Sequence, residues 1–123
     1  MKTFLTLGAC SAMLGVILGA FAAHGLKDKL SESLMSAFQT GVHYQLYHSL
    51  AIILTVILYR QTPAPMLLWS ASFMLAGIVL FSGSLYLLAL SGIKWIGPIT
   101  PLGGLCFIVG WSLLLVASLK GSN

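Results

Sequence analysis

The stretch FQTGVHYQLYHSLAIILTVILY, residues 38–59, decides how the rest of the chain is interpreted. Its first half carries much of the polar chemistry of a hydrophobic chain, including His43, Tyr44 and His48, and its second half is a continuous apolar run. A segment divided in this way is typical of a helix that begins at a membrane surface and ends inside the bilayer. We therefore predict a transmembrane helix whose polar start lies at headgroup level.

The composition also indicates a membrane protein. Of the 123 residues, 59% are hydrophobic and 7% are charged, and a soluble domain of this length could not bury so much apolar surface. The length allows a single transmembrane domain, residues 1–123. The formal net charge of +4 comes from cations spaced along the chain where apolar runs end. That distribution is typical of membrane-flanking residues and not of a phosphate-binding patch, so we expect no nucleic-acid partner.

Four apolar runs give the chain its expected transmembrane helices. These helices are predicted at residues 3–23, 42–59, 66–90 and 101–119. Thr100 and Pro101 fit the start of the last one, because Thr is a good N-cap and Pro wastes no donor at the first helical position. The connections are short. The expected fold is therefore all-α: an integral membrane four-helix bundle in up-down-up-down order.

The segment between the first two spans has the pattern of an amphipathic helix. Apolar residues recur every four positions, while charged and hydroxyl side chains occupy the remaining faces. The apolar positions are Leu26, Leu30, Leu34 and Phe38. This periodicity predicts a helix over residues 26–40 lying in the membrane interface, with Ser31 as a candidate N-cap. Gly41 leaves two alternatives open: a hinge to the second span, or one long helix that runs through it.

Small residues recur at helical spacing in three of the four spans, which predicts close packing of helix backbones. The positions expected to face a neighbouring helix are Ser11, Gly15 and Gly19 in the first span, Gly77 in the third, and Gly103 and Gly110 in the fourth. A signal peptide that is cleaved and discarded has no need of such a ridge. We therefore expect the first span to be retained in the mature protein.

The positive charges do not decide the orientation in the membrane. The four spans place Lys2, Arg60 and Lys120 on one face and Lys27, Lys29 and Lys94 on the other. Because cytoplasmic loops carry an excess of Lys and Arg, an equal division gives no direction. The terminal amine and the signal-anchor character of the first run favour cytoplasmic termini.

Polar residues gather towards the membrane face that bears the first and third loops. The candidate pocket comprises His24, Tyr44, His48, Ser84, Tyr86 and Thr100. Polar groups clustered on one side of packed helices favour a non-enzymatic protein that binds a lipid, a small hydrophobic ligand or a membrane partner. Hydrolysis has little support, since the two carboxylates, Asp28 and Glu32, both lie in the first loop segment and no catalytic pattern occurs. Expected partners are membrane lipids and a second copy or another membrane protein.

Three alternatives remain open for these residues. The structural one is that Tyr44 and His48, which share a helix face, hydrogen-bond to neighbouring helices and fix the register of the bundle. The second is a redox protein that binds haem or a transition metal through His24 and His48; without a nearby Asp, Glu or Cys this ligand set is incomplete, so no metal or cofactor is the leading expectation. The third is a small oligomeric channel or transporter assembled through Gly15 and Gly19.

Three blocks of the sequence together resemble a known family. They are GAFAAHGLKDKL at 19–30, FQTGVHYQLYHSLA at 38–51, and FSGSLYLLAL with GPITPLGGLCFIVGW at 81–111. In this respect the chain is similar to the small bacterial inner-membrane proteins of the YgdD/YwdK-like type, domain of unknown function family 423, to which the eukaryotic transmembrane protein 256 is related. The resemblance implies a multi-pass protein of the bacterial inner membrane and supplies no catalytic residues.

Overall fold

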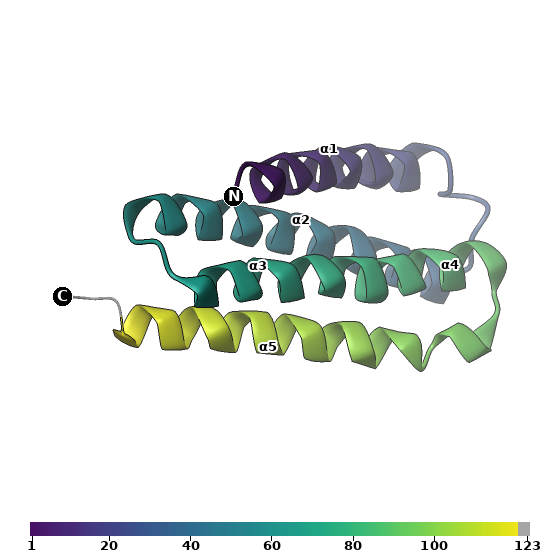
Figure 1. Ribbon diagram of the computed structural model, residues 1–123. Helices are drawn as coiled ribbons and strands as arrows, with labels where there is room; N and C mark the ends of the chain where they lie inside the picture. The colour runs from purple at the N-terminus through teal and green to yellow at the C-terminus, as the bar shows by residue number, and fades with distance from the viewer. Residues whose placement is uncertain (121–123) are drawn as a thin grey trace.

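The computed structural model describes residues 1–120, and all of its regular elements are helices (Figure 1). They are α1 (Lys2–His24), α2 (Glu32–Gln61), α3 (Pro65–Gly77), η1 (Ile78–Ser82), α4 (Gly83–Ser91), η2 (Lys94–Ile96) and α5 (Ile99–Lys120). Because α3, the π-helical segment η1 and α4 form one continuous rod, this part of the chain has four helices long and apolar enough to cross a membrane. The predicted fold class, an all-α membrane four-helix bundle, is confirmed.

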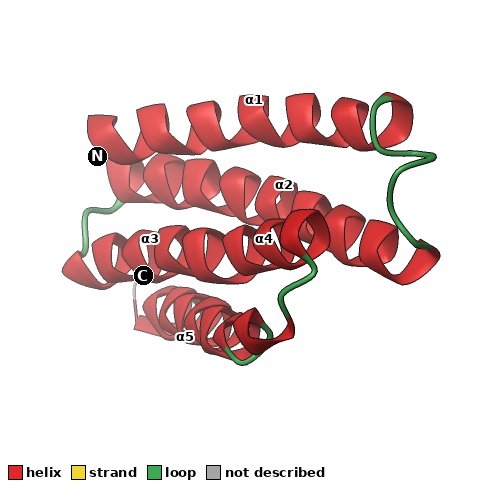
Figure 2. Ribbon diagram, turned by 90° about the vertical axis from the view of Figure 1, so that its right-hand side faces the viewer, coloured by secondary structure: helices red, strands yellow, loops and turns green. Residues whose placement is uncertain are grey.

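Successive spans run antiparallel, so the start of α1 and the end of α5 lie at the same end of the bundle (Figure 1). We call this the terminal end, and we call the opposite end, which carries residues 25–31 and 92–98, the loop end. Across the bundle the order is α1, α2, α3–α4 and α5 (Figures 1 and 2). The first helix packs mainly on α2, and α5 packs mainly on α3 and η1. Large apolar side chains such as Val16 and Ile108 remain exposed, as expected for helices whose solvent is lipid.

The amphipathic segment differs from the sequence-based prediction. Residues 26–30 form turns, and α2 begins at Glu32 with Ser31 as its N-cap, whose hydroxyl oxygen accepts a hydrogen bond of 3.2 Å from the Leu34 N–H. The helix then runs through Gly41 to Gln61 without a break. The chain therefore adopts the second of the two alternatives, one long helix, and the separate interfacial helix over 26–40 is not formed.

The physical reason is that the protein itself covers the apolar face of this segment. Phe38 is fully buried in a cluster with Ala22, Leu26 and Val42, and its ring centroid lies 4.9 Å from that of Tyr86. Packed in this way against α1, the first loop and α4, the face cannot also lie on a membrane surface. The start of α2 is consequently part of the bundle.

Glycines of α1 lie where the helix approaches α2. A Cβ atom at Gly15 would meet Leu46 at 2.7 Å, and one at Gly19 would meet Val42 at 3.3 Å. The neighbouring Ser11 also faces α2, since its carbonyl accepts a hydrogen bond from Gln45. The ridge is therefore used inside the molecule. The use of Gly15 and Gly19 between α1 and α2 argues against an oligomeric channel assembled through these two residues.

On the other side of the bundle, the predicted packing glycines lie between α5 and the third span. A Cβ atom at Gly103 would overlap the backbone of Phe81, and one at Gly77 would overlap the ring of Phe107. At Gly110 an added Cβ would meet Met74 at 2.8 Å. These residues let α5 lie against α3 and η1 at close backbone distance.

The π-helical segment η1 has no counterpart in the sequence-based prediction. The Gly83 N–H donates to the carbonyl of Ile78, five positions earlier, instead of four. A π segment carries one extra residue per turn and therefore changes which side chains face the neighbouring helices. Here Phe81 contacts α5, while the Ser82 hydroxyl donates a 2.6 Å hydrogen bond to the carbonyl of Gly41 in α2.

Candidate functional site

An open groove of about 560 Å³ lies between α2 and α5. Tyr44 and His48 of α2 form one wall, Phe81 of η1 contributes a ring, and α5 supplies the other wall from Pro101 to Trp111. Every one of these residues belongs to a membrane-spanning rod or to its first turn. The groove therefore opens sideways towards lipid, from the loop end of α5 to the middle of that helix.

His48 is held in a fixed position in the wall of this groove. Its Nδ1–H donates to the Tyr44 carbonyl oxygen at 2.8 Å, and its Nε2 accepts from the Trp111 Nε1–H at 3.0 Å. An indole nitrogen can only donate, so Nε2 must be the acceptor and the imidazole is neutral with its proton on Nδ1. The ring is 5% exposed and stacks on Phe107, with centroids 3.6 Å apart. Both nitrogens therefore have partners: Nδ1 bonds within α2, and Nε2 joins α2 to α5.

Tyr44 differs from His48 because its polar atom is free. The ring packs against Phe81, with centroids 4.6 Å apart, and is 39% exposed in the groove. Its hydroxyl makes no hydrogen bond to any other residue in the range 1–120. Together the two residues give the groove one fixed aromatic wall and one hydroxyl that can still donate or accept.

Ser84 and Thr100 form a separate pair at the loop end. Their hydroxyl oxygens are 2.6 Å apart, which links α4 to the first turn of α5, and the Ser84 oxygen also lies 2.9 Å from the Phe81 carbonyl. Neither residue lines the groove. Their hydrogen-bonding capacity is used between helices, as is common for small hydroxyl residues in membrane bundles.

Tyr86 belongs to a buried polar network on another face of α2. Its O–H donates to Gln45 Oε1 at 2.5 Å, and Gln45 Nε2 donates to the Ser11 carbonyl at 2.8 Å. The hydroxyls of Ser11 and Ser49 are 2.7 Å apart. This network connects α4, α2 and α1 through the core. The sequence-based site omitted Gln45 and Ser49, although a glutamine followed four positions later by a serine, on one face of a membrane-spanning helix, was a usable signal for a buried polar face.

His24 lies apart from the other predicted site residues. It is exposed at the end of α1, and α1 runs along α2 with Gly8 against Ser49 and Gly15 against Leu46. His48 is thus level with the part of α1 between those glycines. His24 is more than two helical turns beyond Gly15, which places it at least ~14 Å further along the axis.

The positions of the two side chains do not support a haem or metal site formed by His24 and His48. The structure does not bring the two side chains together, and both nitrogens of His48 already have partners. Within residues 1–120 no three His, Cys, Asp or Glu side chains gather in a way that could hold a metal ion. The six predicted residues thus divide among the groove, the Ser84–Thr100 pair, the Gln45 network and an exposed helix end.

Four apolar spans define the class of this protein: it is a small multi-pass membrane protein. The chain belongs to the family described as "Protein of unknown function (DUF423)", whose model matches residues 18–104. This confirms the family resemblance seen in the sequence.

Its relatives include bacterial proteins that match over nearly the full length. A UPF0382 membrane protein of Staphylococcus epidermidis is 48% identical over 120 residues, covering 98% of each chain. The UPF0382 membrane protein YwdK of Bacillus subtilis is 45% identical over 121 residues, again covering 98% of each chain. No solved structure matches the chain significantly. The names assign these relatives to the membrane and state no activity.

Proposed function

We propose that this chain is a non-enzymatic membrane protein that binds a lipid chain or another small hydrophobic molecule in the groove between α2 and α5. The observation that carries this proposal is the groove itself, about 560 Å³ in volume, with aromatic and aliphatic walls and a Tyr44 hydroxyl that has no hydrogen-bond partner among residues 1–120. Ligand sites are typically concave, mostly apolar and ~300–1,000 Å³ in volume, with a few polar groups that orient the ligand.

The rigidity of the wall supports binding. Two hydrogen bonds and the stack on Phe107 hold the His48 ring, and the bond that Nε2 accepts also holds Trp111 beside it. A wall that is already ordered loses little conformational entropy when a ligand binds. Because the groove faces lipid, its occupant would enter sideways from the bilayer and would not need to cross water.

The chemistry of the groove supports binding over catalysis. A general base needs a free nitrogen or oxygen within reach of the proton that it removes, and the His48 nitrogens are both engaged. The carboxylates Asp28 and Glu32 are exposed at the loop end, in and just after the first loop. We therefore infer that the groove holds its occupant without altering it.

We further infer that the protein lies in the bacterial inner (plasma) membrane with both termini in the cytoplasm. Because the Lys and Arg residues divide equally between the two ends, the support for this orientation comes from the terminal amine and the signal-anchor character of α1. A fusion of alkaline phosphatase after residue 123 tests the orientation, because the enzyme is active only outside the cytoplasm. We expect an inactive fusion, and an active one would reverse the assignment.

Photolabelling tests the groove. We expect a fatty acid that carries a diazirine in its chain, incorporated into liposomes with the full-length protein, to label peptides that contain Tyr44 and Trp111. Gly104 lines the groove with room for a side chain, since an added Cβ would have Phe81 at 3.9 Å as its nearest neighbour. The variant Gly104→Leu should fill the groove and reduce labelling severalfold.

Gly83→Leu provides the matched control, because an added Cβ there meets nothing within 4 Å and Gly83 does not line the groove. Equal labelling of both variants, or label spread evenly over all lipid-facing helices, would reject the groove as a ligand site. A cross-link from the groove to another polypeptide, formed in cell membranes in place of lipid labelling, would instead identify a membrane partner. The expected partners, including a second copy, remain predictions until this is done.

A further inference from the structure

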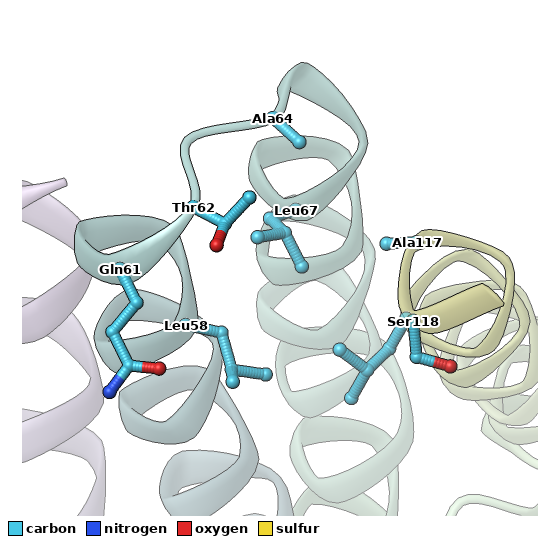
Figure 3. Close-up of a pocket in the computed structure, with 8 residues that line it drawn as sticks. Leu58, Gln61, Thr62, Ala64, Leu67, Ala117 and Ser118 are labelled. Carbon is cyan, nitrogen blue, oxygen red and sulfur yellow. The ribbon is translucent and has the colours of Figure 1, made fainter. Parts of the chain in front are cut away.

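A second cavity lies towards the terminal end of the bundle and shares no lining residue with the groove. It has a volume of about 180 Å³, is partly open, and is bordered by the end of α2, the start of α3 and the end of α5. Leu58 and Leu67 project into the space between these helices, and Ala117 lies on the α5 side (Figure 3). The walls are mainly aliphatic, which fits part of an acyl chain.

The charged side chains nearest to this cavity in the sequence are both positive. Arg60 directly precedes the wall residue Gln61, and Lys120 follows the wall residue Ser118 by half a turn. Both cations are exposed, as is Lys2 at the start of α1. The two acids in the sequence, Asp28 and Glu32, lie at the loop end. Long flexible cations at the end of a transmembrane helix reach the depth of lipid phosphates.

Uncharged polar groups at the mouth of the cavity could also bind a headgroup. The side chains of Gln61 and Thr62 are exposed where the chain leaves α2, and they line the cavity (Figure 3). The adjacent helix α3 begins at Pro65, and its N-cap residue Ala64 provides no side-chain cap, so the Met66 N–H at this helix start has no side-chain acceptor. The positive end of the α3 dipole adds to the positive potential that Arg60 and Lys120 supply.

We propose that the terminal end binds one anionic phospholipid from the surrounding leaflet. Its acyl chain would occupy the cavity between Leu58, Leu67 and Ala117, and its phosphate would lie between Arg60 and Lys120. A zwitterionic lipid offers the same chain, but its cationic group would approach the two basic side chains. Charge complementarity therefore selects the anionic lipid. This site does not depend on the groove between α2 and α5, because the two share no residue.

Native mass spectrometry of the full chain tests the selectivity. The detergent-solubilised protein is titrated with phosphatidylglycerol or with phosphatidylcholine that carries the same acyl chains. We expect phosphatidylglycerol to bind more tightly. In the double variant Arg60→Gln/Lys120→Gln its affinity should fall by roughly 25-fold, about fivefold for each cation removed, while phosphatidylcholine binding stays unchanged. The pair Lys27→Gln/Lys94→Gln removes the same charge at the loop end and should change neither affinity.

A second pair of variants tests the cavity. Ala117→Leu fills it and should weaken both lipids, whereas Ala20→Leu makes the same change on the exposed side of α1. The proposal is overturned if both lipids bind the unchanged protein equally, if the two charge pairs behave alike, or if Ala117→Leu behaves like Ala20→Leu.

Salt provides a test that needs no substitution and therefore does not depend on how the variants fold. The preference of the unchanged protein for phosphatidylglycerol should shrink as ionic strength rises, since exposed charges are screened over ~10 Å at 0.1 M salt. A preference that does not change with salt would show that Arg60 and Lys120 do not select the lipid, and would overturn the proposal.

Discussion

At the scale of single residues, His48 shows how a polar side chain can be accommodated at membrane depth. Both of its nitrogens are paired and its ring stacks on Phe107, so the cost of removing the imidazole from water is offset by specific bonds. The bond from the Trp111 Nε1–H to His48 Nε2 also places this residue of α5 next to α2. One residue therefore fixes the register of two helices and shapes the wall of the groove.

A double-mutant cycle on His48 and Trp111 should reveal this coupling. Trp111→Phe leaves a buried His48 nitrogen without its donor and should cost ~1–2 kcal/mol of unfolding free energy. The double variant His48→Phe/Trp111→Phe removes both partners, so its cost should be less than the sum of the single costs by ~0.5–1.5 kcal/mol. Denaturation in mixed detergent micelles measures these values. Strictly additive costs would mean that the hydrogen bond contributes nothing.

Gln45 is the second residue whose substitution should lower the free energy of unfolding. It connects Tyr86 of α4 to the Ser11 carbonyl of α1, so Gln45→Leu should destabilise the fold by ~2 kcal/mol, while Tyr86→Phe, which removes one bond, should cost ~1 kcal/mol. Gln39→Leu is the matched control because Gln39 is exposed on the same helix. If the exposed substitution destabilises the protein as much as the buried one, the network has no role in stability.

At the scale of elements, length and hydropathy predicted the four spans, because lipid requires each crossing helix to be long and apolar. The segment 26–40 shows where that reasoning fails. Its four-residue period indicated an apolar face, but periodicity does not say whether lipid or protein covers that face. In the structure Phe38 is covered by residues of α1 and α4 that lie far away in the sequence.

The π segment η1 is another element that the sequence did not indicate, and it gives a prediction about chain length. Since a π segment holds one extra residue, deletion of Val79, which is 64% exposed, should convert it to α-helix and keep the register on both sides. Deletion of Ile108, equally exposed but in the regular helix α5, should rotate half of that helix by ~100° and disrupt its contacts.

Thermal unfolding followed by circular dichroism compares the two deletions. We expect the Val79 deletion to keep a cooperative transition within several degrees of the unchanged protein, and the Ile108 deletion to lose it. Comparable damage from both would show that η1 is not a removable insertion.

At the scale of the whole molecule, the sequence predicts only the depth of the candidate site residues along their helices. The sequence gives the depth of each residue along a span, and most of the predicted residues do lie towards the loop end. It does not give the rotation of each helix or the identity of its neighbour. His48 accepts a hydrogen bond from Trp111, 63 positions away in the sequence. Tyr86 instead donates to Gln45, and the Thr100 hydroxyl pairs with that of Ser84. Predicted site residues that lie at a similar depth therefore take part in three separate contacts.

The arrangement of helices also makes α1 the most separable part of the molecule. It packs mainly on α2, through glycines and the Ser11–Ser49 contact, in which the hydroxyl oxygens are 2.7 Å apart. In a background with Cys10→Ser and Cys106→Ser, the pair Ser11→Cys/Ser49→Cys should therefore form a disulfide on mild oxidation, since its sulfur atoms can come within bonding distance. This cross-link reports whether α1 is docked.

Adding Gly15→Leu to this cross-linking variant should abolish the disulfide, because a side chain there collides with Leu46 and separates the two helices. Val16→Leu, at the next position but exposed, should leave it intact. Fluorescence from Trp69, Trp95 and Trp111, none of which lies in α1, should stay unchanged in both variants and show that α2 to α5 remain folded. A disulfide that still forms in Gly15→Leu would mean that α1 packs on α2 without the close approach at Gly15. A change in tryptophan fluorescence would mean that the whole bundle needs α1 in order to stay folded.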